Sequence, residues 1–124
     1  MKKKICVITS TRAEYGLLRN VIRNIEADDS LECKLVVTGS HLVPEFGNTV
    51  EEIEKDGNEI DAKVEIQMAG DSSTSTCKTM GIALISFGEY FERIKPDFVV
   101  ILGDRYEMCA IACAAINFKI PMTR

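Results

Sequence analysis

An acidic and a basic residue, Asp104 and Arg105, stand directly after a run of five apolar residues and a glycine. A carboxyl group at the end of a buried strand is partly desolvated, and this tunes its proton affinity for general acid–base catalysis. An Asp in this position is equally suited to capping the helix that follows. Arg105 could keep Asp104 ionised or bind a phosphate group. The pair is therefore a candidate for acid–base chemistry or for capping.

His41 is the only histidine of the chain and follows Gly39 and Ser40. An imidazole changes its charge near neutral pH, so it can take up and release a proton. A lone histidine can equally serve the structure, by hydrogen bonding to the backbone of its loop. Both roles for His41 stay open at this point.

Thr11 and Arg12 lie between a strand-like apolar run and a helical pattern. The amino terminus of a helix together with a guanidinium group suits a phosphate or diphosphate. The alternative is that Thr11 only caps the helix and Arg12 is solvated. The segment lacks the G-x-G-x-x-G pattern of dinucleotide-binding folds, and the chain has no G-x-x-x-x-G-K-[ST] phosphate loop.

Alternating strand and helix patterns supply the scaffold for these candidates. Apolar or alternating runs predict strands at residues 4–9, 32–38, 60–68, 98–102 and 120–122. Helical spacing of apolar residues predicts helices at residues 17–25, 48–55, 80–94 and 107–118, the third preceded by a loop at 70–73 and ended by Pro96. Asn48 is a plausible amino-terminal cap for the second of these helices.

This alternation predicts an α/β fold with a parallel sheet and right-handed crossovers. The first and fourth strands are apolar throughout and should be central, whereas the third alternates with polar residues and should be an edge. The order is then 3-2-1-4-5, a doubly wound Rossmann-like sheet. Ligands bind such sheets beyond the carboxyl ends of the strands where the winding reverses. Arg12, His41, Asp104 and Arg105 should therefore meet at one rim.

Composition excludes several classes of protein. The chain has 124 residues, 46% of them hydrophobic and 27% charged, which is typical of a single soluble globular domain. The formal net charge of −4 argues against nucleic acid or an anionic membrane as a partner. No apolar run approaches the roughly 20 residues of a membrane helix, and the basic amino terminus is not followed by the apolar region of a signal peptide. We expect a cytoplasmic protein.

The five cysteines form no C-x-x-C pair. Cys109 and Cys113 lie four residues apart in an apolar helix, where we expect buried, reduced thiols rather than a metal or redox site. A single histidine without a metal-ligand cluster makes a zinc site improbable. Gly81 and Gly88 lie near one face of the long helix, where we expect them to permit close packing.

Three ordered motifs resemble one known family. They are Thr-Arg-Ala-Glu-Tyr-Gly at residues 11–16, Thr-Gly-Ser-His-Leu-Val-Pro-Glu-Phe-Gly at 38–47, and Lys-Pro-Asp-Phe-Val-Val-Ile-Leu-Gly-Asp-Arg-Tyr-Glu at 95–107. Together they closely resemble the hydrolysing UDP-N-acetylglucosamine 2-epimerases, and the likeness runs over essentially the whole chain. The resemblance implies a glycosyltransferase-B-type fold of two Rossmann-like domains, with the nucleotide sugar in the cleft between them.

The resemblance also implies a reaction and roles for residues. A carboxylate removes the proton at C2 of the sugar while UDP leaves C1, and water then adds with C2 inverted, giving UDP and N-acetylmannosamine for sialic or nonulosonic acid synthesis. No metal or redox cofactor is needed. Asp104 matches the family's acid–base residue, and His41 is expected to face the sugar as a second catalytic group. Arg12, Arg105, Ser40 and Thr11 are expected to bind the substrate.

The resemblance further implies that residues 1–124 form the amino-terminal domain. Family members continue into a loop with another catalytic carboxylate and a second, nucleotide-binding domain, both absent from this chain. We therefore expect no turnover by the 124 residues alone, and a homo-oligomer for the full-length protein. Two alternatives stay open: a non-hydrolysing 2-epimerase, which the Ser-His-Leu and Tyr-Gly motifs disfavour, and a non-catalytic module that binds a nucleotide sugar or a partner through the same rim.

Overall fold

The computed structural model describes residues 2–42, 49–66, 72–102 and 105–123. Five strands form one parallel sheet in the order β3-β2-β1-β4-β5. They are β1 (Lys3–Thr9), β2 (Leu31–Thr38), β3 (Ile60–Val64), β4 (Phe98–Val100) and β5 (Met122–Thr123). The predicted order 3-2-1-4-5 and the Rossmann-like class are confirmed.

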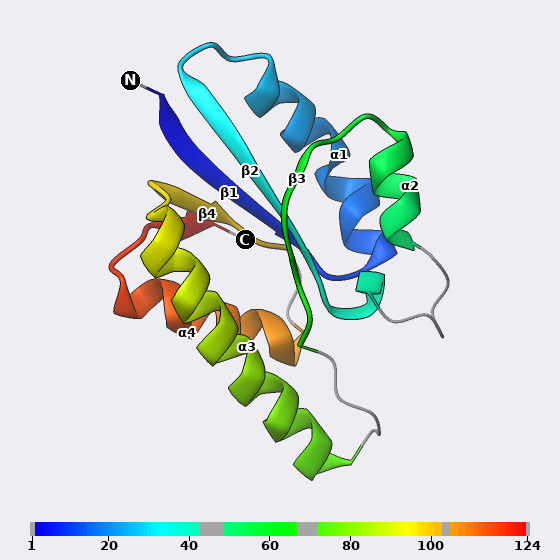
Figure 1. The fold of residues 1–124 in the computed structure, drawn as a ribbon, viewed down its shortest axis with the longest axis vertical. Coiled ribbons are helices and arrows are strands. Elements are labelled where there is room, and N and C mark those ends of the chain that lie inside the picture. The colour runs from blue at the N-terminus through cyan, green and yellow to red at the C-terminus, as the bar shows by residue number, and fades with distance from the viewer. Residues whose placement is uncertain (1, 43–48, 67–71, 103–104, 124) are drawn as a thin grey trace.

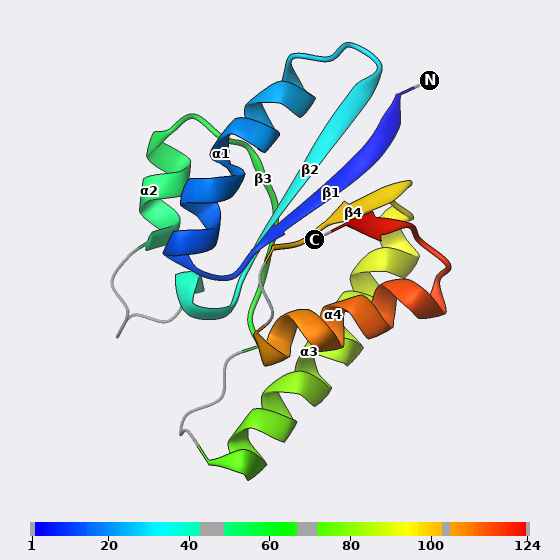
Figure 2. The ribbon, with the colours of Figure 1, turned by 180° about the vertical axis from the view of Figure 1, so that it is seen from behind.

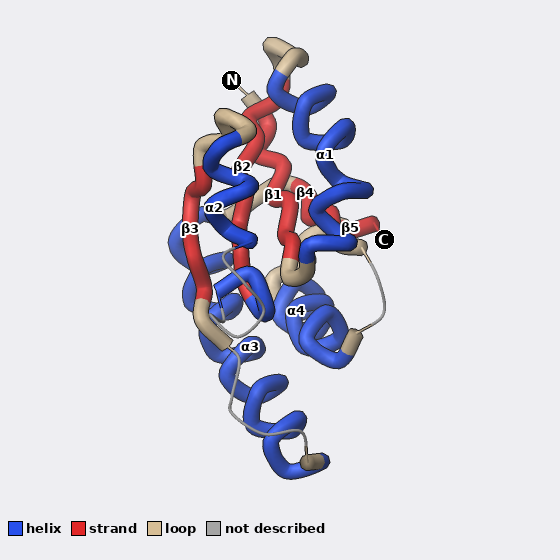
Figure 3. The backbone as a smooth tube through the Cα atoms, turned by 90° about the vertical axis from the view of Figure 1, so that its right-hand side faces the viewer, coloured by secondary structure: helices blue, strands red, loops and turns tan. Residues whose placement is uncertain are grey.

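Helices cover both faces of this sheet. They are α1 (Arg12–Glu26), α2 (Thr49–Lys55), α3 (Ser73–Ile94) and α4 (Tyr106–Asn117), and a short 3-10 helix, η1 (Gly39–Leu42), follows β2. Figures 1 and 2 show α1 and α2 together on one side of the strands, and α3 beside α4 on the other. The tube in Figure 3 shows the strands running between these groups of helices. No helix in the described ranges is long and apolar enough to span a membrane.

The central strands are apolar throughout because successive side chains enter different cores. Val7 packs with α1 on one face, whereas its neighbours Cys6 and Ile8 join the α3 and α4 side chains on the other. All three are fully buried. Each buried aliphatic side chain of this size contributes about 1.5–3 kcal/mol to folding. The alternation of residues between two cores is what holds the strand ends, and thus the rim, in place.

At the edge of the sheet, β3 has the alternating exposure expected of a strand with one wet face. The predicted strand at residues 60–68 is longer than the observed one, which ends at Val64. The predicted cap Asn48 and residues 67–68 lie outside the described residues. Thr11 is the amino-terminal cap of α1, and its side chain accepts a hydrogen bond from the backbone N–H of Glu14.

Two packing predictions are wrong. Cys109 and Cys113 are exposed, because α4 turns Ala110, Ile111 and Ala114 toward the core and the two thiols the other way. Gly81 and Gly88 do not permit a close approach, since a Cβ atom at either glycine would meet nothing within 4 Å. Of the other thiols, Cys6 is buried, Cys33 is partly buried and Cys77 is exposed, and all five thiols are free.

Candidate functional site

A buried serine at the end of β1 joins the first turns of two helices. The Ser10 backbone N–H and its hydroxyl Oγ both lie 2.9 Å from Oε1 of Glu14 in α1. The same hydroxyl lies 3.1 Å from Oε1 of Glu107 in α4. Ser10 is fully buried, and Glu14 and Glu107 are 7% and 2% exposed. Two carboxylates are therefore held inside the protein at the carboxyl edge of the sheet.

Arg105 connects this buried pair to the surface. Its Nε lies 2.6 Å from Oε1 of Glu107, while its own side chain is 49% exposed. The hydrogen bond to Glu107 is the main cause that raises the pKa of the Arg105 guanidinium. The second oxygen of Glu107, Oε2, is buried and has no hydrogen-bond partner among the described residues. Arg105 is thus a half-exposed cation held from below by a buried anion.

His41 ties the loop after β2 to the end of β1. Its Nε2 lies 2.9 Å from the Thr9 hydroxyl, and its Nδ1 lies 2.9 Å from the Thr49 hydroxyl at the start of α2. The Thr9 hydroxyl also lies 3.3 Å from the Thr11 carbonyl. Each ring nitrogen therefore has a hydroxyl partner, whichever of the two carries the proton.

Burial keeps this ring uncharged. His41 is 2% exposed, and desolvation lowers the pKa of its imidazole to about 4, against smaller raising effects of the Thr11 backbone and Glu52. A neutral imidazole with both nitrogens bonded to hydroxyl groups joins β1, η1 and α2. The geometry gives His41 a definite structural contribution, and the expectation that it also faces a sugar stays a prediction.

A glycine allows these two strand ends to meet. Gly39 has φ of +62°, and a Cβ atom there would lie 2.8 Å from Cβ of Ser10. An L side chain would be strained in that backbone conformation and would also collide with the serine. Gly39 is therefore required for the close approach of η1 to the end of β1.

The remaining residues predicted for the site are Arg12, Thr11, Ser40 and Asp104. Arg12 is 73% exposed along its side chain and forms an ion pair of 3.1 Å with Glu52 of α2. Thr11 caps α1, and its expected contact with the substrate stays a prediction. The backbone of Ser40 belongs to η1, but its side chain is outside the description. Asp104 lies outside the described residues, which include Leu102 before it and Arg105 after it.

The contacts confirm that three segments meet, as the topology predicts. The Ser10–Glu107 bond joins residues 9–16 to residues 105–107, and the Thr9–His41 bond joins them to residues 39–42. The starts of α1 and α4 and the η1 turn come together at the lower edge of the sheet in Figure 1. In chemical terms, the rim offers exposed guanidinium groups above buried carboxylates, an arrangement suited to a diphosphate.

Sequence reasoning missed Glu14 and Glu107. Glu14 stands three residues after Thr11, the spacing of a capping box, and this pattern could have identified it. Glu107 is the one acidic residue of α4, and an isolated carboxylate in an otherwise apolar helix is a signal for a buried polar contact. The candidates were chosen because they directly follow predicted strands, and neither Glu14 nor Glu107 does.

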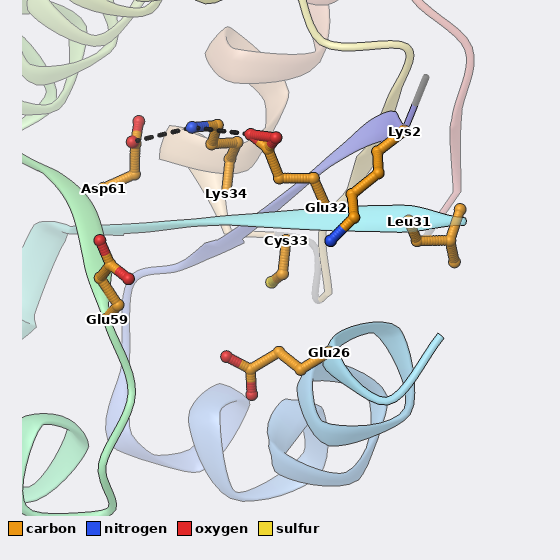
Figure 4. Close-up of a pocket in the computed structure, with 8 residues that line it drawn as sticks. All are labelled: Lys2, Glu26, Leu31, Glu32, Cys33, Lys34, Glu59 and Asp61. Carbon is orange, nitrogen blue, oxygen red and sulfur yellow. Dashed lines mark ion pairs between the residues drawn. The ribbon is translucent and has the colours of Figure 1, made fainter. Parts of the chain in front are cut away.

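A separate cavity of about 420 Å³ opens at the opposite end of the sheet. Figure 4 shows its wall at the start of β2, where Lys34 lies between Glu32 and Asp61. The Lys34 Nζ is 3.0 Å from Glu32 and 3.5 Å from Asp61. These charges satisfy one another within the wall. Since the amino ends of parallel strands do not bind ligands in folds of this type, we do not assign the site to this cavity.

No group of three or more histidine, cysteine or acidic side chains within the described ranges is arranged to hold a metal ion. At this rim the structure brings Arg105, Glu107, Ser10 and Glu14 into contact.

Comparison with known proteins finds one family. A family model described as UDP-N-acetylglucosamine 2-epimerase matches residues 23–123. The chain is 47% identical over 121 residues to a protein of Campylobacter jejuni named GDP/UDP-N,N'-diacetylbacillosamine 2-epimerase (hydrolyzing). It is 41% identical over 122 residues to the UDP-N,N'-diacetylbacillosamine 2-epimerase (hydrolyzing) of Legionella pneumophila. Each alignment covers 98% of this chain but only 31% and 32% of the relatives, so the chain spans about a third of their length.

Solved structures have the same fold. The UDP-GlcNAc 2-epimerase of Methanocaldococcus jannaschii, in complex with UDP-GlcNAc and UDP, matches with a TM-score of 0.78 at 25% identity. The match covers 97% of this chain and 31% of that chain.

Proposed function

The chain belongs to the UDP-N-acetylglucosamine 2-epimerase family, and on that premise we propose that it forms part of a hydrolysing 2-epimerase of a UDP-linked 2-acetamido sugar. The observation that carries this proposal is the high identity, over nearly the whole chain, to two relatives whose names both include the word hydrolyzing. The rim with its exposed Arg105 above the buried Glu107 supports it independently, because a leaving diphosphate needs such a cation.

The sugar we propose is N,N'-diacetylbacillosamine, with N-acetylglucosamine as the second candidate. Both relatives are named for the diacetylated sugar, whereas the sequence motifs on their own indicate N-acetylglucosamine. Either sugar carries an acetamido group on C2, the carbon that is inverted. A non-hydrolysing epimerase is not favoured, since it would return a sugar that is still attached to UDP.

The proposed reaction has two steps. Asp104 takes the proton from C2 while the C1–oxygen bond to UDP breaks, and a double bond forms between C1 and C2. Water then adds its hydroxyl to C1, and a proton reaches C2 from the opposite face. Arg12 and Arg105 stabilise the negative charge that develops on the departing diphosphate, with Thr11 and Ser40 as further contacts to the substrate.

The complete protein is expected to consist of two domains. We propose that residues 1–124 are its amino-terminal Rossmann-like domain and that a second domain closes the cleft over the nucleotide. The length of the relatives, about three times the matched part, supports this division. The 124 residues alone are expected to give no turnover. A homo-oligomer and a cytoplasmic location remain predictions for the complete protein, which we place in sialic or related nonulosonic acid synthesis.

Product analysis tests the proposal. Protein expressed from its complete reading frame is incubated with UDP-N,N'-diacetylbacillosamine and, separately, with UDP-N-acetylglucosamine. The expected result is free UDP with a free C2-inverted sugar, and a higher kcat/KM for the diacetylated substrate. A product still attached to UDP would overturn the hydrolysing reaction. An equal or higher kcat/KM for UDP-N-acetylglucosamine would overturn only the choice of sugar.

A further inference from the structure

We propose that Glu107 is a positioning residue, whose buried carboxylate fixes the guanidinium of Arg105 at the rim to receive the diphosphate of a UDP-sugar. The inference rests on the proposed function and extends it to a residue that does not itself touch substrate, because Glu107 is only 2% exposed.

The contact between the two side chains leaves the outer part of Arg105 available. Glu107 Oε1 holds Nε at 2.6 Å, the innermost nitrogen of the guanidinium group. The two terminal amino groups of an arginine can then bond two oxygens of a phosphate. Glu107 forms the only ion pair of Arg105 among the described residues, and the ring of Tyr106 lies 5.6 Å from the Arg105 Cζ. The ion pair with Glu107 therefore engages the base of the guanidinium, and Tyr106 also interacts with this group.

Arg105 also stands where an anion is favoured. It is the amino-terminal cap residue of α4, yet its side chain makes no capping hydrogen bond. The first backbone N–H groups of a helix lack partners within the helix, and their partial positive charge attracts anions. The guanidinium and the start of α4 thus act on the same region of the rim.

The second oxygen of Glu107 shows that this residue is a poor choice for stability alone. Oε2 is buried and has no hydrogen-bond partner among the described residues. A buried polar atom left unpaired costs about 1–3 kcal/mol. A carboxylate kept only to stabilise the fold would be expected to bond through both oxygens. We attribute the presence of a carboxylate at this position to its ion pair with Arg105.

Hydrogen bonds beneath Glu107 fix the position of its carboxylate. The Ser10 hydroxyl lies within hydrogen-bond distance of Oε1 of both Glu107 and Glu14 and shares its one hydrogen between them, which links the carboxylate in α4 to the first turn of α1. Arg12 begins that same helix. The two arginines expected to bind the diphosphate are therefore carried by helices that one serine ties together.

The test measures ligand affinity in protein expressed from its complete reading frame. Glu107→Gln keeps the size of the side chain and removes its charge. We expect the Kd for UDP to rise about tenfold and the Kd for UMP, which lacks the second phosphate, to rise by about twofold or less. Both kcat and kcat/KM for the UDP-sugar should fall, because Arg105 acts on the charge that develops on the departing diphosphate. The midpoint of thermal unfolding should stay level or rise, because a buried charge is removed.

A double-mutant cycle tests whether Glu107 acts on UDP affinity through Arg105. If Glu107 acts through Arg105, Glu107→Gln should change the UDP affinity in the native background but not in an Arg105→Ala background. Ser10→Ala provides a second variant that leaves both charges in place, and it should weaken UDP binding by a few fold in the native background only. Glu54→Gln is the matched control, since Glu54 forms an exposed ion pair with Lys63 away from the rim.

Distinct outcomes separate this inference from the function on which it rests. Native protein that binds neither UDP nor a UDP-sugar would overturn the proposed function, and this inference with it. Native protein that binds UDP, with folded Glu107→Gln binding equally well, would overturn the positioning role alone. An equal loss of affinity in the native and Arg105→Ala backgrounds would also overturn only that role. Should Glu107→Gln not fold, unchanged UDP affinity in Ser10→Ala would likewise contradict it.

Discussion

At the scale of single residues, His41 shows how burial decides what an imidazole can do. Its ring lies between the hydroxyl groups of Thr9 and Thr49, and desolvation lowers its pKa to about 4. In the unfolded chain the pKa of a histidine returns to about 6.5. Between these two values the unfolded state binds more protons than the native state, so acid favours unfolding.

We therefore expect the stability of the protein to fall as the pH drops from about 7 toward about 4. The free energy of unfolding should be about 1–2 kcal/mol lower at about pH 5 than at about pH 7 through His41 alone. Urea unfolding at the two pH values measures this difference. His41→Gln, which cannot titrate, should reduce the pH dependence, and an unchanged slope in that variant would show that other groups cause it.

Glu14 is a second residue whose contribution can be measured alone. Its carboxylate accepts from the Ser10 backbone N–H and hydroxyl, and its own N–H donates to the Thr11 cap. Glu14→Ala should destabilise the fold by about 1–3 kcal/mol, because the buried backbone N–H of Ser10 loses its acceptor while the hydroxyl keeps Glu107. Denaturant unfolding measures the change. Glu51→Ala in the first turn of α2, where the side chain is exposed, serves as control and should have little effect.

At the scale of elements, the strands could be predicted from the sequence, but the buried face of each helix could not. The apolar runs that become β1 and β4, and the alternation in β3, determine the order of the sheet because they report how many faces of each strand are buried. The helix α4 is apolar around most of its circumference, so periodicity could not choose its core face, and Cys109 and Cys113 were assigned to the wrong side.

The same distinction explains what was found and missed at the site. Topology brings the ends of β1, β2 and β4 together, so the meeting of three segments was predictable from the order of the strands. The buried Ser10–Glu107 bond depends on side-chain directions in helices that pack on the sheet. No local pattern in a single sequence specifies those directions.

The glycines of α3 give a prediction at this scale. Gly81 and Gly88 lie inside the helix with open space where a Cβ atom would be. Gly81→Ala and Gly88→Ala should each stabilise the protein by about 0.5–1 kcal/mol, since alanine loses less conformational freedom in a helix. Gly39→Ala, with its positive φ and the contact to Ser10, should instead destabilise it by about 2 kcal/mol or more. Denaturant unfolding of the three variants would reveal any reversal of these signs.

At the scale of the whole molecule, the thiols report which surfaces the chain leaves open. Cys77, Cys109 and Cys113 are exposed, whereas Cys6 is buried and burial raises its pKa. Burial also raises the pKa of Cys33 to about 12. In the folded 124-residue chain, three thiols should react rapidly with a thiol reagent and Cys6 only on unfolding. Protection of Cys109 and Cys113 in the complete protein would locate a further contact on α4, and rapid labelling of Cys6 would contradict the fold.

The two ends of the sheet differ in how their charged residues are arranged. In the wall of the cavity at the amino ends, Lys34 pairs with Glu32 and Asp61, while the rim at the carboxyl ends combines an exposed arginine with buried carboxylates. The proposed chemistry belongs to the second end. It depends above all on one step, in which Asp104 removes the proton from C2 of a sugar whose UDP leaves from the neighbouring carbon.

Proton NMR in deuterated water observes that step. Protein expressed from its complete reading frame is incubated with UDP-N,N'-diacetylbacillosamine, and Asp104→Asn is treated in parallel. We predict free UDP and a C2-inverted sugar that carries deuterium at C2, with no deuterium incorporation by Asp104→Asn although it still binds UDP. A free sugar that retains its original hydrogen at C2, or deuterium incorporation at the native rate by Asp104→Asn, would contradict the proposed mechanism.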